Sequence, residues 1–204
     1  MNELDQLVDA HFIIDMMYAR TNNMVGRAVY EEIGYGNVAY MHKDVLKALL
    51  NIVPFLEEYK LKMRICDAYR PPIAHQKLLE IIPHSKAKFF AQAPEKSNHC
   101  HGTALDVCLT DIGGNNLLYP TEIDAYEKRF QEQVSKNLFT EFDRHLQKAR
   151  HDYMEALPEA IANREQLKSL MENIGFESIT HEWWHYNLRN WQSYPLIEWQ
   201  CLFS

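Results

Sequence analysis

Two segments concentrate side chains that could hold a metal ion and activate a water molecule. Residues 97–106 read Ser-Asn-His-Cys-His-Gly-Thr-Ala-Leu-Asp, and residues 181–185 read His-Glu-Trp-Trp-His. Imidazole nitrogens and carboxylate oxygens are donors that Zn²⁺ takes in catalytic sites, where three protein ligands leave a fourth position for water. Together the two segments predict a zinc-dependent hydrolytic site.

The second segment, taken alone, matches the zincin signature H-E-x-x-H, in which two ligands lie one helical turn apart around a general base. That interpretation requires a helix. The surrounding residues are instead typical of a strand: Ile179, Thr180, Trp183, Trp184 and Tyr186. No further histidine follows at the spacing of a metzincin. We therefore favour a site that joins the two segments.

In the joined site, His99, Asp106 and His185 supply two nitrogens and one oxygen to a single zinc ion. Glu182, three residues before His185, would take the proton from the attacking water. An offset of three residues on an ideal strand puts two side chains on opposite faces. The hypothesis therefore requires a bulge or a turn near residues 183–184.

Hydrophobic spacing predicts the elements that must position these residues in the first half of the chain. Residues 43–59 carry apolar side chains at helical spacing, and Pro54 should kink or divide that helix. Residues 61–67 alternate apolar and polar side chains, as a half-buried strand does. A proline-led helix should follow at about residues 72–82, and residues 103–109 form a second β-like run.

The second half begins with a more heavily charged stretch. Residues 122–172 hold eleven acidic and eight basic residues and no glycine, which predicts a helix-rich segment broken near Pro158. Gly175 is well placed to end the last helix in a left-handed conformation. Strands should follow at residues 176–180 and 183–188, where aromatic and β-branched residues gather.

These elements predict an α+β fold, with a small antiparallel sheet, helices packed around it and the zinc site at the sheet. The chain has 204 residues, a length that fits one domain. We expect that single domain to span residues 1–204, with the longer charged helical segment at about 122–172 as an elaboration within it.

Composition narrows the partners and the compartment. A formal net charge of −7 lacks the basic footprint that nucleic acid or an anionic membrane selects. No stretch reaches the ~18 apolar residues of a membrane span, and the acidic N-terminus does not resemble a signal peptide. The four cysteines have no close pairs and are interpreted as free thiols. We expect a cytoplasmic protein with neither a nucleic-acid nor a membrane partner.

The combined motifs resemble a known family. The patterns S-x-H-x-x-G-x-A-x-D at residues 97–106 and E-x-W-H at residues 182–185 are similar to those of the zinc D-Ala-D-Ala peptidases. Two further segments resemble the D-alanyl-D-alanine dipeptidase branch: Asp-Ala-Tyr-Arg-Pro at residues 67–71, and Tyr-Ala-Arg-Thr-Asn-Asn-Met-Val-Gly-Arg at residues 18–27. The order and spacing of all four segments extend the resemblance over most of the chain.

The resemblance implies a role for each matching residue. It assigns His99, Asp106 and His185 as ligands of one Zn²⁺ per chain. It makes Glu182 the catalytic base and Arg70 the group that stabilises the oxyanion of the tetrahedral intermediate. A guanidinium suits that role because it stays charged and directs two donors at once.

The resemblance also implies substrate contacts. Tyr18 and Asp124 match residues that receive the free amino end of a dipeptide, and Ser97 lines the site. Cys100 and His101 stand where the family more usually has small or basic residues. We interpret Cys100 as a spectator thiol, and His101 either hydrogen-bonds the site or offers a spare ligand. The remaining histidines are interpreted as surface or satisfied residues: His11, His42, His75, His84, His145 and His151.

Three functions remain open at this point. The leading hypothesis is a dipeptidase that hydrolyses D-alanyl-D-alanine to two D-alanines. The alternatives are a D,D-carboxypeptidase or endopeptidase acting on cell-wall peptides, and a zinc-stabilised binding module without turnover. The sequence does not separate D-alanine recycling from glycopeptide resistance. It also leaves the oligomeric state open, a homo-oligomer included.

Overall fold

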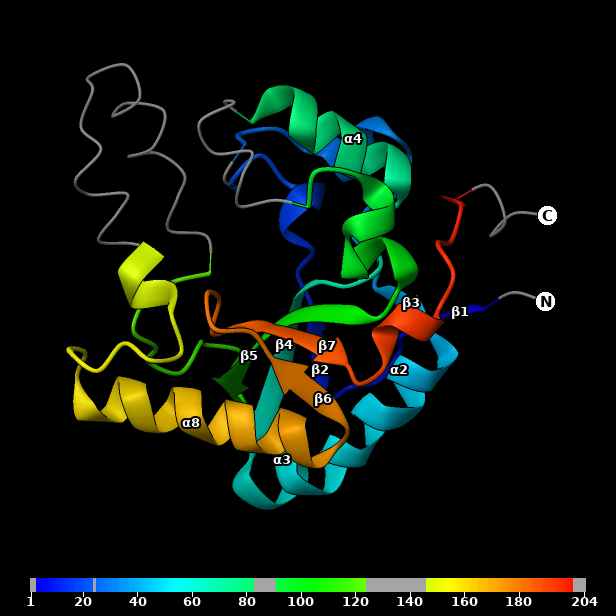
Figure 1. Cartoon of the computed structure of the whole chain (residues 1–204). Coiled ribbons are helices and arrows are strands. Elements are labelled where there is room, and N and C mark those ends of the chain that lie inside the picture. Colours follow the sequence, from blue (N-terminus) through cyan, green and yellow to red (C-terminus); the bar gives the residue numbers. More distant parts are fainter. Residues whose placement is uncertain (1–2, 24, 83–90, 124–145, 200–204) are drawn as a thin grey trace, which may run out of the picture.

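The centre of the molecule is a five-stranded sheet with the strand order β2-β4-β5-β7-β6 (Figure 1). The structure is a computed structural model that describes residues 3–23, 25–82, 91–123 and 146–199. In sheet order the strands are Phe12–Ile14, Leu61–Asp67, Ala104–Asp111, His185–Leu188 and Phe176–Ser178.

The antiparallel sheet predicted from the sequence is confirmed for four of these strands and is wrong for the fifth. β4, β5, β7 and β6 pair antiparallel, but β2 pairs parallel to β4. A separate antiparallel ribbon joins β1 (Leu4–Gln6) to β3 (Tyr40–His42). Strands of three residues are too short to show an alternating pattern, so the sequence did not predict the N-terminal strands.

The first predicted helix is divided as Pro54 requires. α2 (Lys43–Leu49) runs through a 3₁₀ turn (Leu50–Ile52) into α3 (Val53–Tyr59), which has Pro54 in its first turn. A proline in the first turn forfeits only an amide that would lack a helical partner in any case. The chain then enters β4 directly.

The second predicted helix is also confirmed. α4 (Pro72–Ile81) begins at the second proline of the Arg-Pro-Pro sequence. The shorter helical elements are α1 (Val29–Glu32) and the 3₁₀ turns η1 (Met17–Ala19), η3 (Pro94–Lys96), η4 (Asn98–His101) and η5 (Trp191–Ser193).

The charged segment is described only in part, because residues 124–145 lie outside the described chain. Its last helix, α8 (Pro158–Asn173), begins at Pro158, as predicted. Gly175 follows it with φ +106°, the positive backbone angle expected after a helix end.

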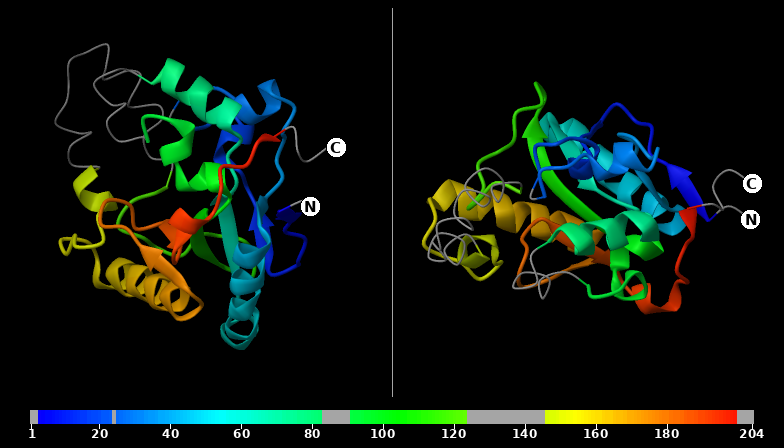
Figure 2. Two further views of the ribbon diagram at one scale, coloured as in Figure 1. Left: turned by 45° about the vertical axis from the view of Figure 1, so that its right-hand side comes forward. Right: turned by 90° about the horizontal axis from the view of Figure 1, so that it is seen from above.

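Helices cover both sides of the sheet. α8 packs against β6 and α3 against β4, and both lie below the sheet in Figure 1. α4, η1 and η4 lie above it, an arrangement repeated in the left-hand view of Figure 2. β5 is buried along nearly its whole length and is the central strand of the sheet. Among the described helices, none is long and apolar enough to cross a membrane.

Candidate metal centre

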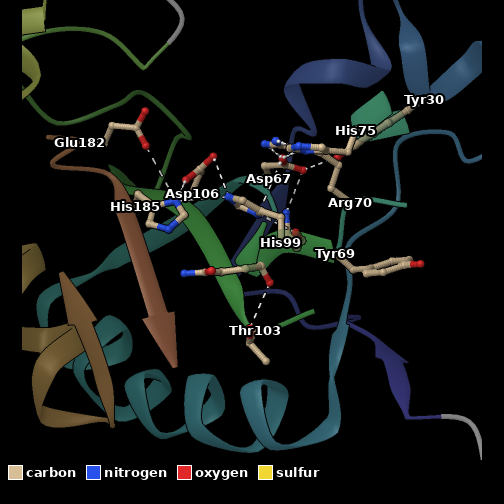
Figure 3. Close-up of polar contacts among 12 residues, drawn as sticks. Tyr30, Asp67, Tyr69, Arg70, His75, His99, Thr103, Asp106, Glu182 and His185 are labelled. Atoms are coloured by element: carbon tan, nitrogen blue, oxygen red, sulfur yellow. Dashed lines mark hydrogen bonds and ion pairs between the residues drawn. The ribbon is translucent and has the colours of Figure 1, made fainter. Parts of the chain in front are cut away.

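Three donors from three different elements meet above the sheet (Figure 3). His99 lies on η4, Asp106 on β5, and His185 begins β7 directly opposite Asp106 in the antiparallel register. His185 Nδ1 lies 3.0 Å from Asp106 Oδ1, and His99 Nε2 lies 3.3 Å from His185 Nδ1. All three ligand atoms fall within 4.8 Å of one another, and all three residues are buried. We call these residues the metal triad.

The position of His99 depends on Gly102, which ends η4. Gly102 has φ +68°, and its amide donates to the carbonyl of His99 at 2.9 Å. A Cβ atom here would meet Leu4 Cδ2 at 2.8 Å and the amide nitrogen of His42 at 3.1 Å. Both the backbone angle and the lack of space therefore require glycine, as the tight turn between the two ligands demands.

Hydrogen bonds on the outer nitrogens orient both imidazoles. His99 Nδ1 lies 2.7 Å from the carbonyl oxygen of Ala68, and His185 Nε2 lies 2.9 Å from Asn187 Oδ1. Each outer nitrogen faces an acceptor and must carry the hydrogen, which leaves the lone pair on the inner nitrogen. Two inner lone pairs and a carboxylate then point at one position. This donor set fits a zinc ion.

The electrostatics of the metal triad agree with a cation site. Burial alone would raise the pKa of Asp106, but the charges and hydrogen bonds of His99 and His185 lower it far below its usual range. Burial alone would lower the pKa of His185, but its hydrogen bond to Asp106 raises it. The group therefore retains a negative carboxylate and attracts positive charge at neutral pH.

Glu182 reaches the metal triad through a turn. Residues 183–184 form that turn before β7, and the amide of His185 donates to the carbonyl of Glu182 at 3.3 Å. Glu182 Oε2 lies 3.9 Å from His185 Nδ1, and its side chain is 38% exposed. Desolvation by the surrounding protein raises the pKa of Glu182, and the negative charge of Asp106 raises it further. The turn required by the joined site is confirmed, and this segment does not form the helix of a zincin.

The chain just after the undescribed part of the charged segment braces this turn. Ala149 accepts from the amide of Trp183 at 2.8 Å, and the amide of His151 donates to the carbonyl of Thr180 at 3.0 Å. These backbone bonds hold both ends of the loop that carries Glu182. The sequence does not indicate this contact, since a backbone bond over some thirty positions leaves no residue-type signal.

Arg70 is buried beside the metal triad in a network of its own. Its Nε and Nη2 donate to Asp67 Oδ2 at 3.0 Å and 2.6 Å. Tyr30 and the amide of Ala68 donate to Asp67 Oδ1, and the guanidinium lies over the ring of Tyr18. Burial alone would lower the pKa of Arg70, but the Asp67 carboxylate raises it well above its usual value. Arg70 therefore stays charged and fixed in place.

His75 completes this network, which we call the arginine cluster: Arg70, Asp67, Tyr30 and His75. His75 Nε2 lies 2.8 Å from the carbonyl of Ala91, and its Nδ1 lies 3.4 Å from Arg70 Nη1. Burial and the nearby Arg70 lower the pKa of His75 to about 4. The neutral ring thus accepts from Arg70. The interpretation of His75 as a satisfied histidine is confirmed, although the sequence did not reveal its partner.

A β-bulge brings the two groups together. The pairing of β4 with β5 runs regularly to Ile65 opposite Val107 and then shifts at Cys66, so that Asp67 lies opposite Asp106. One carboxylate serves Arg70 and the other the metal triad. A bulge re-aims side chains in this way at many active sites.

The predicted substrate contacts are placed unevenly. Tyr18 is buried beneath Arg70, and burial raises the pKa of its hydroxyl. Ser97 is buried at the start of η4, where its carbonyl accepts from the amide of Cys100. Asp124 lies outside the described residues.

The surroundings of Cys100 and His101 do not favour either residue as a metal ligand. Burial raises the pKa of the Cys100 thiol to about 12, so it stays protonated. His101 Nδ1 lies 2.8 Å from the carbonyl of Tyr194, and its Nε2 lies 3.0 Å from the carbonyl of Glu95. The His101 ring therefore links two backbone segments rather than supplying a fourth ligand.

Comparison with known proteins gives a consistent result. The chain matches the family described as D-ala-D-ala dipeptidase over residues 2–196. It is 30% identical to the D-alanyl-D-alanine dipeptidase of Escherichia coli K12, covering 100% of this chain and 96% of that protein. It is also 30% identical to the D-alanyl-D-alanine dipeptidase of Enterococcus faecium, over 49% of this chain and 40% of that one.

Among solved structures, a vancomycin-resistance D,D-pentapeptidase, VanY, in complex with Zn(II) shares 14% identity over 77% of each chain. The TM-score of that match is 0.34. The match over nearly the whole chain and the 30% identity to a relative covered over 96% of its length are decisive. The chain belongs to the D-ala-D-ala dipeptidase family and is a zinc metallopeptidase.

Proposed function

We propose that this protein hydrolyses D-alanyl-D-alanine to two D-alanines, using one Zn²⁺ per chain held by His99, Asp106 and His185. The observation that carries the proposal is the convergence of three buried donors beside an acid and a fixed arginine. A purely structural zinc site would close its fourth position with another protein ligand. Among the described residues, no other cluster of potential metal ligands is found.

Zinc held by these donors would supply a Lewis acid that polarises the scissile carbonyl and lowers the pKa of a bound water to about 7. Glu182 is the general base. Its carboxylate borders the metal triad and remains partly open to solvent, so an attacking water can reach it. Its raised pKa makes it a better proton acceptor than an ordinary glutamate. The same carboxyl then returns the proton to the leaving amine.

Arg70 stabilises the negative charge that develops on the carbonyl oxygen. Asp67 and His75 engage three of its five N–H groups, which fixes the plane of the guanidinium and leaves donors for the oxyanion. Because the network is already formed, little reorganisation is needed during the reaction. Tyr18 supports the guanidinium from below.

Recognition of a free dipeptide needs groups for its charged ends. We assign Asp124 to the substrate ammonium, because a carboxylate gives a charge-assisted hydrogen bond there. Tyr18 would help to receive the same amino end, and Ser97 would line the site. These assignments favour a short substrate with a free amino group over a longer capped peptide.

The test is an assay of the zinc-loaded protein on D-Ala-D-Ala, L-Ala-L-Ala and an N-acylated tripeptide ending in D-Ala-D-Ala. We expect cleavage of D-Ala-D-Ala with little activity on the other two. Cleavage of the capped peptide alone would instead indicate a carboxypeptidase or endopeptidase. Stoichiometric zinc with no cleavage of any substrate would indicate a binding module.

A matched pair of variants tests the assigned roles. Glu182→Gln keeps the shape of the side chain and should retain zinc while losing most turnover. His185→Ala should lose the zinc itself. Turnover at the parental rate in Glu182→Gln would overturn the role of the base.

A further inference from the structure

Asn187 receives two hydrogen bonds on one oxygen atom. It lies two residues after His185 on β7, so both side chains point to the same face of the sheet. Asn187 Oδ1 lies 2.9 Å from His185 Nε2 and 2.6 Å from Asn98 Nδ2. Asn187 is 4% exposed, so its side chain is largely shielded from bulk water.

The strand that faces Asn187 is β5, which also carries Asp106. Asn187 pairs across the sheet with Ala104, two residues before Asp106 on β5. The pair Asn187–Ala104 therefore lies two residues along β7 and β5 from the pair His185–Asp106. Asn98 reaches Asn187 from η4, where its Nδ2 donates to Asn187 Oδ1.

Hydrogen bonds hold the backbone of Asn98 in place. Both the amide and the hydroxyl of Thr103 donate to the carbonyl of Asn98, at 3.2 Å and 3.1 Å. The carbonyl of Thr103 accepts from the amide of Leu188 at 2.8 Å. The segment that carries His99 is therefore tied to the strand that carries His185, and the bond between the two asparagines is one of these ties.

The orientation of the Asn187 amide decides which nitrogen of His185 can bind a metal. With its oxygen towards Nε2, the hydrogen stays on Nε2 and the lone pair on Nδ1 faces the metal triad. A flipped amide would present its NH₂ group to Nε2, which would then have to accept, and the hydrogen would move to Nδ1. The NH₂ group of Asn98 opposes that flip, because it would face another NH₂ group.

We propose that Asn187, oriented by Asn98, is a positioning residue that keeps His185 in the tautomer able to bind zinc through Nδ1. The inference rests on the metal centre of the proposed function. A neutral amide suits the role, since Asp106 and Glu182 already supply two negative charges near the position of a divalent cation. The Asn187 amide thus orients the His185 ring without adding a third negative charge.

The test measures zinc affinity directly, by competition with a chromogenic chelator at fixed pH. Asn187→Leu keeps the side-chain shape and removes the acceptor, and we expect it to raise the zinc Kd by about 10–100-fold. Asn187→Asp restores an acceptor for the Nε2 hydrogen and should bind zinc at least as tightly as the parent. Asn98→Ala leaves the acceptor but releases its orientation, so it should weaken zinc binding by less than Asn187→Leu.

The matched control is Asn116→Leu. Asn116 Oδ1 accepts from Arg64 Nε at 2.9 Å and from Cys108 Sγ at 3.4 Å, and neither donor is a ligand of the metal triad, so its loss should leave zinc affinity unchanged. Thermal unfolding of each zinc-free variant separates packing from positioning. If Asn187→Leu does not fold, the zinc affinities of Asn98→Ala and Asn187→Asp are compared instead. Asn98→Ala should bind zinc more weakly than Asn187→Asp.

The outcomes distinguish this inference from the proposed function. If His185→Ala abolishes zinc binding while a folded Asn187→Leu binds as tightly as the parent, the positioning role alone is overturned. It is also overturned if Asn187→Asp and Asn187→Leu weaken zinc binding equally. If the parent binds no zinc, or His185→Ala binds it as well as the parent, the metal centre is wrong and the inference falls with it.

Discussion

In the metal triad, three acceptor atoms face one another, whereas in the arginine cluster every strong acceptor faces a donor. His99, Asp106 and His185 direct two lone pairs and a carboxylate at one point. Asp67 instead receives Arg70 and Tyr30 on its two oxygens. The two groups are adjacent and both are buried.

The difference lies in where the balancing charge comes from. The arginine cluster carries its own cation, so the folded chain alone completes it. The metal triad needs a cation from outside, or a proton in its place. We therefore expect changes in the arginine cluster to affect stability and turnover while sparing zinc, and changes in the triad to affect zinc first.

The largest effect should follow removal of the metal. Treatment with a chelator should reduce turnover to background, because both the Lewis acid and the activation of water are lost. Unfolding followed by circular dichroism should show a lower Tm for the zinc-free protein, since a ligand that binds only the native state stabilises it. Readdition of zinc should restore both properties, whereas Mg²⁺, which prefers oxygen ligands, should not. Undiminished turnover after complete removal of zinc would refute the metal centre.

Next in size is the loss of the counter-ion of Arg70. Asp67→Asn leaves a buried guanidinium without its carboxylate and should lower the free energy of unfolding by about 3–5 kcal/mol, measured by urea denaturation. The control is Asp15→Asn, which breaks the more exposed pair of Asp15 with Arg64 and should cost about 1 kcal/mol or less. An equal decrease in the free energy of unfolding in the two variants would show that the buried Asp67–Arg70 pair matters no more to stability than the more exposed pair.

A smaller effect is expected from Arg70→Lys. The lysine keeps the charge but loses the planar fork, so kcat should fall by about 10²–10³-fold, as when one oxyanion donor is removed. Zinc affinity should stay at the parental value. Arg64→Lys provides the control and should leave kcat unchanged. A loss of zinc in Arg70→Lys would show that the two groups are not separable.

The smallest effect concerns pH. In the zinc-free protein the pKa of His185 is raised, so its contribution to stability is present below the unfolded value of about 6.5 and is lost as pH rises through the folded value. Zinc requires the unprotonated ring, so the zinc-loaded protein should gain stability over the same range. Each unit of pKa shift corresponds to about 1.4 kcal/mol. Thermal unfolding with and without zinc should therefore give opposite pH trends, and His185→Gln should abolish both.

The sequence predicted those parts of the fold that depend on local chemistry. Pro54 and Pro72 mark helix starts because a proline lacks the amide that a helix interior needs. The turn before His185 could be required in advance, since Glu182 and His185 cannot share a face of an ideal strand. In each case a single residue type or spacing carried the information.

What the sequence could not supply are contacts between distant backbones. The bulge at Cys66 has no mark in the sequence, because the extra residue is an ordinary cysteine at the end of an alternating run that is typical of a regular strand. The parallel pairing of β2 with β4 depends on the path of the chain between the two strands. The brace from Ala149 and the partner of His75 likewise arise only when remote segments meet. The same holds for Asn187, whose role depends on the tautomer of its neighbour.

Gly102 has a practical consequence for anyone who shortens or tags this chain. The space behind it is filled from both directions, by Leu4 near the start of the described chain and by Ile197 near its end. Trimming either end would remove a side chain that packs against the turn at Gly102, which carries His99. Neither Leu4 nor Ile197 is itself a metal ligand. Shortened variants should therefore be selected for zinc retention rather than for expression yield.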